Sequence, residues 1–169
     1  LKDCAETASK GSIVTIGVNP SFPSTGYGYI KCGPKIETGT DTNFYESEGF
    51  REKPDAPTAA DFIEAECYKW NSGMFAWSVS TIMKAFEEHA PGLAKGSEVI
   101  KDAISKGTFE RNLEIQYQLF EKISIDYAVM EKVNNVVVAE CTFDWDDVGS
   151  WTALRNQIRP SENNNVVQA

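Results

Sequence analysis

The chain has 169 residues, of which 41% are hydrophobic and 24% are charged, and its formal net charge is −9. This size and composition fit one globular domain with a hydrophobic core and argue against disorder. The acidic balance disfavours a nucleic-acid partner, because such binding relies on Lys and Arg side chains that neutralise phosphates. No apolar run approaches the roughly 20 residues that span a bilayer. We therefore expect no membrane association and a cytoplasmic location.

The cysteines and the single histidine carry little chemistry of their own. Cys4, Cys32, Cys67 and Cys141 lie far apart and form no C-x-x-C pattern. We expect reduced thiols within apolar or amphipathic segments, as in a cytosolic protein. His89 lies near a predicted helix end, where its charge is favourable, and one distal histidine does not make a catalytic triad.

Helices and strands alternate along the first third of the chain. The chain starts with Leu1, and residues 1–10 resemble the latter part of a helix that Gly11 ends. Pro54 stops the last strand of this region. The expected elements are a helix over 1–10, a buried strand over 12–18, a strand over 27–32, a turn region over 33–43 and a partly solvated strand over 43–53.

The remainder is richer in helical patterns. Thr58 and Ser124 are expected to cap helices, and the glycines at 96 and 107 are expected to interrupt a long helical region. Leu113, Tyr117 and Phe120 recur at helical spacing. The expected elements are a helix over 56–69, a strand over 71–79, a helix over 80–90, helical pieces over 91–123, a short helix over 125–133, a strand over 134–143 and a helix over 150–158.

Strands separated by helices predict an α/β fold, and its sheet should be mixed because residues 27–53 resemble a hairpin. In such sheets ligands bind beyond the strand ends. Three unusual stretches fall at strand ends: residues 20–30, "REKPD" at 51–55 and "DWDDVGSW" at 144–151. The first combines two prolines with Gly26 and Gly28, which predicts a rigid approach to a glycine-hinged turn.

The pair Glu52–Lys53 has two interpretations. Adjacent strand residues point to opposite faces, so only an irregular strand end would let both side chains face one ligand. There the carboxylate could accept two vicinal hydroxyls while the ammonium meets a phosphate. The alternative is a solvated charged pair before a turn.

Two further stretches allow a site or a plain structural role. Asn71 carries both a donor and an acceptor, which suits sugar hydroxyls, but Asn-Ser-Gly also makes an ordinary turn. Asp144, Asp146 and Asp147 suit Mg²⁺, which is usually held by one or two carboxylates and substrate phosphates. They would equally favour the N-terminus of a helix that Ser150 caps.

The stretch 123–132, "ISIDYAVMEK", offers weaker candidates. Asp126 fits the first turn of a helix, where a negative charge is favoured. Glu131 and Lys132 fit a solvated face, and Met130 fits the core.

Together these stretches resemble the bacterial-type mannose-1-phosphate guanylyltransferases, which make GDP-mannose. The resemblance runs in that family's order through "VTIGVNPSFPSTGYGYI", "FREKPD", "YKWNSGMFAW", "ISIDYAVMEK" and "FDWDDVGSW", and it covers most of residues 12–155. The family belongs to the sugar-nucleotide pyrophosphorylases, whose fold is a GT-A, Rossmann-like one. The resemblance therefore implies a mixed sheet flanked by helices.

The resemblance also implies roles for individual residues. Tyr27 and Gly28 would line the sugar pocket, and Asn71 would contact the sugar. Glu52 and Lys53 would contact the sugar hydroxyls and the phosphate. Asp147 would bind the catalytic Mg²⁺, with Asp146 a weaker candidate. Lys53 and Asp147 would be the catalytic residues.

The family's Gly-rich loop, of the pattern G-G-x-G-x-R-L-x-P-L, and a second metal-binding Asp do not occur in this sequence. The resemblance thus implies that residues 1–169 are a single partial nucleotidyltransferase domain, the sugar-binding side, without the N-terminal nucleotide-binding part. The parent enzyme would transfer GMP from GTP to mannose 1-phosphate, and the isolated chain would be inactive.

Two other functions stay open at this point. One is a sister hexose-1-phosphate nucleotidylyltransferase of other specificity. The other is a truncated, non-catalytic domain that binds sugar phosphates or mediates assembly. The expected partners are mannose 1-phosphate and GTP or GDP-mannose, and a homo-oligomer is compatible with the family.

Overall fold

The computed structural model describes residues 1–149 and residue 158. Helices and strands alternate in it as expected. The elements are α1 (Lys2–Ser9), β1 (Ile13–Val18), β2 (Gly28–Ile36), β3 (Phe44–Arg51), α2 (Ala56–Glu64), β4 (Tyr68–Ala76), α3 (Val79–His89), α4 (Pro91–Ser105), α5 (Phe109–Leu119), the π-helix η1 (Asp126–Met130) and β5 (Val136–Glu140). The helix expected over 150–158 lies, apart from its last residue, outside the described residues.

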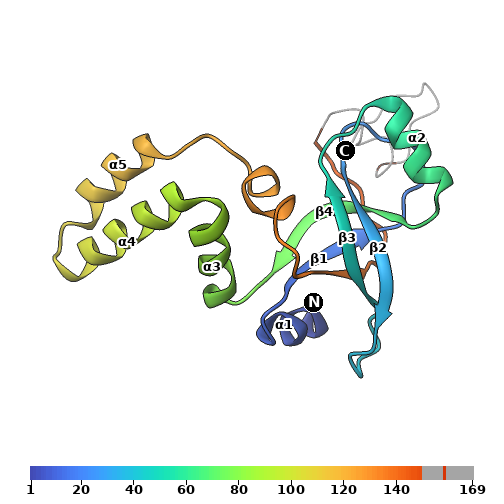
Figure 1. Cartoon of the computed structure of the whole chain (residues 1–169), viewed down its shortest axis with the longest axis horizontal. Helices are drawn as coiled ribbons and strands as arrows, with labels where there is room; N and C mark the ends of the chain where they lie inside the picture. Colours follow the sequence, from blue (N-terminus) through green and yellow to red (C-terminus); the bar gives the residue numbers. More distant parts are fainter. Residues whose placement is uncertain (150–157, 159–169) are drawn as a thin grey trace.

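The five described strands form one mixed sheet in the order β1-β4-β2-β3-β5 (Figure 1). Successive neighbours in this order pair antiparallel. β5 also pairs parallel with β1, so that the ladder of hydrogen bonds closes on itself. The predicted α/β fold with a mixed sheet and flanking helices is confirmed, and β2 and β3 form the expected hairpin.

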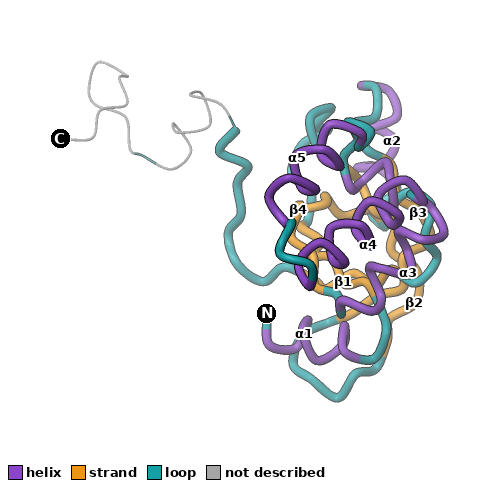
Figure 2. The backbone as a smooth tube through the Cα atoms, turned by 90° about the vertical axis from the view of Figure 1, so that its left-hand side faces the viewer, coloured by secondary structure: helices purple, strands orange, loops and turns teal. Residues whose placement is uncertain are grey.

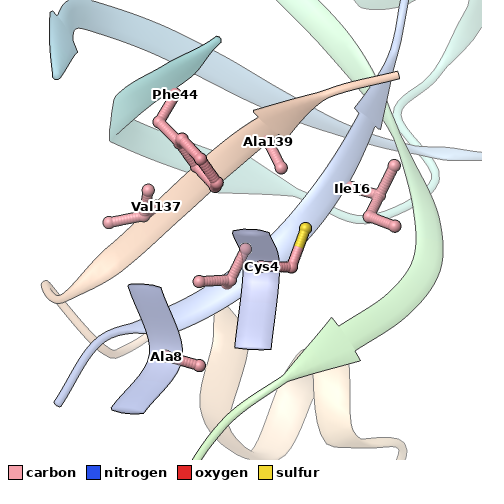
Figure 3. Close-up of a cluster of buried hydrophobic side chains, with 7 residues drawn as sticks. Cys4, Ala8, Ile16, Phe44, Val137 and Ala139 are labelled. Carbon is pink, nitrogen blue, oxygen red and sulfur yellow. The ribbon is translucent and has the colours of Figure 1, made fainter. Parts of the chain in front are cut away.

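The centre of the sheet is buried on both sides because helices cover both faces. β1 is buried along its whole length. On one face, Cys4 and Ala8 of α1 pack with Ile16, Phe44 and Val137 (Figure 3). On the other face, Ile13 packs with residues of α3 and η1, such as Ile82 and Val129. The placement of Ile13 and Ile16 in different clusters follows the two-residue repeat of a strand.

The helices α4 and α5 form a hairpin that extends away from the sheet (Figure 1) and lies in front of the strands when viewed from that end (Figure 2). The expected interruption near Gly107 is confirmed, because α4 ends at Ser105 and Gly107 has a φ of +68°. The interruption expected near Gly96 is wrong. α4 continues through this residue, and the ring of Phe120 lies where a side chain at Gly96 would have to be. No residue of α5 is buried, and Tyr117 is 74% exposed.

Several element boundaries differ from the prediction. β2 continues to Ile36 through the expected turn region, and β4 begins at Tyr68 although a helix was expected to residue 69. α2 is capped by Asp55, whose carboxylate accepts a hydrogen bond from the backbone N–H of Thr58, the residue expected to be the cap.

Other predictions are confirmed. All four cysteines are free thiols, His89 lies in the last turn of α3, and Met130 is buried. Within the described residues, no helix is both long enough and apolar enough to cross a membrane.

Candidate functional site

Three of the residues expected to bind a sugar meet where β2, β4 and the end of β3 come together. Gly28 of β2 lies opposite Asn71 of β4 in the strand register. A side-chain carbon added at Gly28 would collide with the Glu52 carboxylate and would lie 3.3 Å from Cβ of Asn71. The absence of a side chain at Gly28 therefore lets the Glu52 carboxylate lie directly against β2, beside Asn71.

The end of β3 is irregular, as a shared role of Glu52 and Lys53 requires. β3 ends at Arg51, and Lys53 has a φ of 44°, in the left-handed region. The Nζ atom of Lys53 lies 3.7 Å from Oε1 of Glu52, so the two side chains reach the same side. The side chain of Glu52 is 11% exposed and that of Lys53 is 59% exposed. The carboxylate of Glu52 is thus largely buried while the neighbouring ammonium of Lys53 stays accessible.

Glu52 lies in an acidic neighbourhood. Burial raises the pKa of its carboxyl group above the usual value near 4.5, and the negative charges of Asp126 and Glu131 raise it further. Lys53 opposes this shift in pKa. Burial and the neighbouring acids thus disfavour the ionised form of the Glu52 carboxyl group. Carboxyl groups with pKa values perturbed in this way are common at functional sites.

Hydrogen bonds hold the side-chain amide of Asn71 in one orientation. Its Oδ1 atom accepts from the hydroxyl of Thr15 at 3.0 Å and from the backbone N–H of Gly73 at 3.3 Å. Its Nδ2 atom donates to Oδ1 of Asp126 at 3.1 Å. Since Thr15 is fully buried, the amide is anchored to the core. The second N–H of Nδ2 remains for a ligand.

Tyr27 connects the loop between β1 and β2, residues 19–27, with the acidic stretch that follows β5. Its ring packs edge-on against Trp70 and Trp145, with centroids 5.0 and 5.5 Å away. Burial raises the pKa of the Tyr27 hydroxyl, and the charges of Asp146 and Asp147 raise it further. The structure therefore places both acids near this tyrosine, with Asp146 half-buried and Asp147 exposed.

The expected magnesium ligand Asp147 has no ready-made set of partners. Among residues 1–149 and 158, no group of three or more His, Cys, Asp or Glu side chains is arranged to hold a metal. Mg²⁺ is commonly held by one or two carboxylates and completed by substrate phosphates and water. A single exposed carboxylate, that of Asp147 near Tyr27, fits a metal site of that kind.

Lys69 of β4 connects two segments that lead to the site, and it was not recognised from the sequence. Its ammonium is mostly buried and donates to Oδ1 of Asn19 at 2.6 Å and to Oε1 of Glu140 at 2.7 Å. Asn43 donates to the other oxygen of Glu140 at 2.8 Å. Hydrogen bonds from Lys69 and then Asn43 lower the pKa of Glu140. Asn19 begins the loop to Gly28, and Glu140 begins the segment to Asp147, so one lysine connects both.

Two more residues of the site were only weak candidates in the sequence. Asp126 holds Asn71, as described above. Glu131 was expected on a solvated face, but its Oε1 atom accepts the backbone N–H of Glu52 at 3.1 Å. The signal for both was their place in a quoted motif. The contacts themselves join residues 55 and 79 positions apart, which local patterns do not reveal.

Comparison with known proteins gives consistent matches over the whole chain. The nucleotidyl transferase family matches residues 1–163. The mannose-1-phosphate guanylyltransferase of Sinorhizobium fredii is 36% identical over 169 residues, which is 99% of this chain and 32% of the relative. That of Escherichia coli is 34% identical over 168 residues, again 99% of this chain and 36% of the relative. The chain thus spans about a third of the length of these relatives.

Solved structures show the same likeness. A Thermus thermophilus structure described as a mannose-1-phosphate geranyltransferase has a TM-score of 0.76 and 37% identity. The match covers 92% of this chain and 42% of that one. A Helicobacter pylori structure described as a mannose-6-phosphate isomerase has a TM-score of 0.70 and 27% identity over 86% of this chain and 56% of that one.

Proposed function

Because this chain belongs to the nucleotidyl transferase family, we propose that it forms the sugar-phosphate side of an enzyme that makes GDP-mannose. That enzyme transfers GMP from GTP to mannose 1-phosphate and releases pyrophosphate. The observation that supports the proposal is the close approach of Gly28, Glu52 and Asn71 in a chain whose relatives are named mannose-1-phosphate guanylyltransferases. In this proposal residues 1–169 are part of one nucleotidyltransferase domain, and a further part binds the nucleotide.

The pocket can hold a hexose by its hydroxyls. The carboxylate of Glu52 accepts hydrogen bonds from two neighbouring hydroxyls, and the free N–H of Asn71 donates one. Gly28 leaves the Glu52 carboxylate in its place, since any side chain at this position would displace it. Tyr27, packed between two tryptophan rings, forms the adjoining wall.

Lys53 is suited to the phosphate of the sugar substrate. Its ammonium is exposed and lies 3.7 Å from the carboxylate that binds the sugar. A phosphate on C1 of the hexose would therefore be within reach of a cation while the hydroxyls contact Glu52. The phosphate oxygen then attacks the α-phosphorus of GTP, the bond to the leaving pyrophosphate breaks, and the phosphate needs no base because it is already anionic. Positioning and charge neutralisation dominate such reactions.

Asp147 would hold the magnesium ion that reactions of this class use. The ion would supply charge neutralisation at the transferring phosphoryl group. This chain would contribute by holding the segment that contains Asp146 and Asp147 next to Tyr27, through the packing of Trp145 on the Tyr27 ring. A cytoplasmic site of action is part of the same proposal, since nucleotide sugars are built from cytoplasmic GTP.

The proposal is tested in the full-length protein that contains this chain, by measuring pyrophosphate release. Lys53→Ala should raise the KM for mannose 1-phosphate at least tenfold, since a charge-assisted hydrogen bond contributes about 1.5–3 kcal/mol. Lys101→Ala, which removes an exposed lysine of α4, is the matched control and should change neither KM nor kcat. An unchanged KM and kcat in Lys53→Ala would reject the assignment of this pocket.

Substrate specificity is tested in the same assay with GTP, ATP, UTP and dTTP, each against several hexose 1-phosphates. The highest kcat/KM is expected with GTP and mannose 1-phosphate. A higher value with another pair would instead identify a sister pyrophosphorylase.

A further inference from the structure

The backbone at Lys53 is held in a conformation that its own residue type disfavours. Its φ of 44° lies in the left-handed region, which costs a non-glycine residue about 1–2 kcal/mol. The following residue, Pro54, disfavours the right-handed helical region for Lys53 and so leaves extended backbone as the relaxed alternative. A strained conformation of this kind persists only where the surrounding structure imposes it. The contacts around Lys53 should therefore show what imposes it.

One side chain fixes this turn from a distant part of the chain. Oε1 of Glu131 accepts the backbone N–H of Glu52 at 3.1 Å, across 79 residues of sequence. Pro54, on the other side of Lys53, is buried. The residues on both sides of Lys53 are therefore fixed: the backbone N–H of Glu52 is hydrogen-bonded and Pro54 is buried.

Glu131 is itself well placed to serve as an anchor. Its backbone N–H donates to the carbonyl of Asp126 at 3.0 Å, which closes the end of η1. The three residues before it, Ala128, Val129 and Met130, are all buried in the core below α3. The backbone at Glu131 is therefore held in place, although its side chain is exposed.

We propose that Glu131 is a positioning residue of the sugar-phosphate pocket, which acts by accepting the Glu52 N–H and so holding Lys53 in its left-handed conformation. This inference rests on the proposed function. If the turn relaxed to extended backbone, consecutive side chains would point to opposite faces. Glu52 and Lys53 would then no longer reach one ligand, and the phosphate contact would be lost while the sugar contact remained.

The first test separates the hydrogen bond from the charge. In the full-length protein, Glu131→Gln keeps an acceptor oxygen, whereas Glu131→Met keeps the length but has none. Glu131→Met should raise the KM for the hexose 1-phosphate about tenfold, as expected for loss of a charge-assisted hydrogen bond. Its KM for the nucleotide should stay near that of the wild type. Glu131→Gln should stay within about threefold of the wild type for both substrates.

A matched control is Glu121→Met, which changes an exposed glutamate ten positions earlier and should leave both KM values unchanged. If Glu131→Gln behaves like Glu131→Met, the charge matters and the proposed hydrogen bond does not. An equal rise in the KM for the nucleotide would likewise overturn the proposal, because it would indicate a general structural defect.

The second test asks whether Glu131 acts through Lys53. If it does, Glu131→Met should add less than about twofold to the KM of Lys53→Ala, because the two changes remove the same contact. Fully additive effects would overturn the proposal.

A crystal structure of Glu131→Met gives a readout that needs no activity, and it should show Lys53 outside the left-handed region. A retained φ near 44° would overturn the inference. A wild-type protein that releases no pyrophosphate from any nucleotide and hexose 1-phosphate would instead reject the proposed function. The crystal structure would still decide the role of Glu131 in that case.

Discussion

The ammonium of Lys69, near the start of β4, and the carboxylate of Glu140, at the end of β5, lie 2.7 Å apart. Both side chains are largely buried, with 11% and 21% exposed. The lysine also bonds Asn19 and the glutamate also bonds Asn43, so no charge in this group lacks a hydrogen-bond partner. This network fixes Asn19, where the loop over residues 19–27 leaves β1, and Glu140, where the segment with Asp144, Asp146 and Asp147 leaves β5.

Removing Lys69 should destabilise the fold strongly. Lys69→Met leaves Glu140 buried without its cation, and breaking a buried pair in this way costs about 3–5 kcal/mol. The free energy of unfolding can be measured by urea denaturation followed by tryptophan fluorescence. Lys101→Met breaks an exposed pair with Glu98 and should cost less than about 1 kcal/mol. Equal losses in the two variants would contradict the structural role given to Lys69.

The same pair predicts a dependence on pH. Lys69 and Asn43 lower the pKa of Glu140 below its usual value near 4.5. A lowered carboxyl pKa stabilises the fold above the usual pKa, and this stabilisation is lost as the pH falls through the lowered pKa. The difference in unfolding free energy between wild type and Lys69→Met should therefore be constant near pH 7 and should shrink below about pH 4.5. A difference that grows in acid would show that Glu140 is not the partner.

Glu52 should limit stability in exchange for binding. Its pKa is raised, so its ionised form destabilises the folded state above its usual pKa, and this cost disappears as the pH falls below it. Glu52→Gln should therefore raise the unfolding free energy at pH 7 by about 1 kcal/mol, as changes at functional residues often do.

The same variant should raise the KM for the sugar phosphate at least tenfold, because an ionised acceptor is lost. Glu46→Gln, on an exposed position of β3, is the control and should change neither quantity. A Glu52→Gln variant that is less stable at pH 7 would contradict the raised pKa.

Gly28 should be intolerant of a side chain for reasons of binding more than of folding. The methyl group in Gly28→Ala would displace the Glu52 carboxylate, which is the far end of a flexible side chain and can move. We expect a loss of about 1–3 kcal/mol in stability from crowding and a rise of at least tenfold in the KM for the sugar phosphate.

Gly26→Ala is the matched control for this change, since the nearest atom to the new methyl group would be Oγ of Ser24 at 3.7 Å. Its KM should stay near that of the wild type. A similar rise in both variants would mean that loop flexibility, and not the space at Gly28, matters.

The order and type of the elements could be predicted because they depend on local patterns. The β-branched run of β1 and the capped helices α2 and α3 are recognisable without any neighbour. The boundary between α2 and β4 was misplaced because Cys67 to Lys69 fit either element, and pairing of Tyr68 with Lys31 decides for the strand. Local propensity yields to tertiary pairing at such places.

Gly96 shows why a breaker residue can mislead. Glycine in a helix interior usually indicates an interruption, because it costs about 1 kcal/mol relative to alanine. In α4 the glycine is needed since Phe120, which follows α5, packs directly on it. The prediction failed because the reason for Gly96 lies 24 positions away in the sequence.

The candidate site divides in the same way. Gly28, Glu52, Lys53 and Asn71 could be named from motifs and residue chemistry, and the end of β3 before Pro54 was predicted. Lys69 was missed, and the supporting contacts of Asp126 and Glu131 could not be predicted, because an ordinary charged side chain gains such a role only from a distant partner.

The closure of the sheet by β5 also determines how the chain can assemble. Each of the five described strands has a neighbour on both sides, so the described sheet presents no open edge that could pair with another molecule. β5 is the last described strand in the sequence, and the sheet closes only when β5 pairs with β1, for example Val136 with Ile13. During synthesis, β1 and β3 each keep one unpaired edge until residues 136–140 emerge. Aggregation of nascent chains should therefore be governed by the five-residue strand β5.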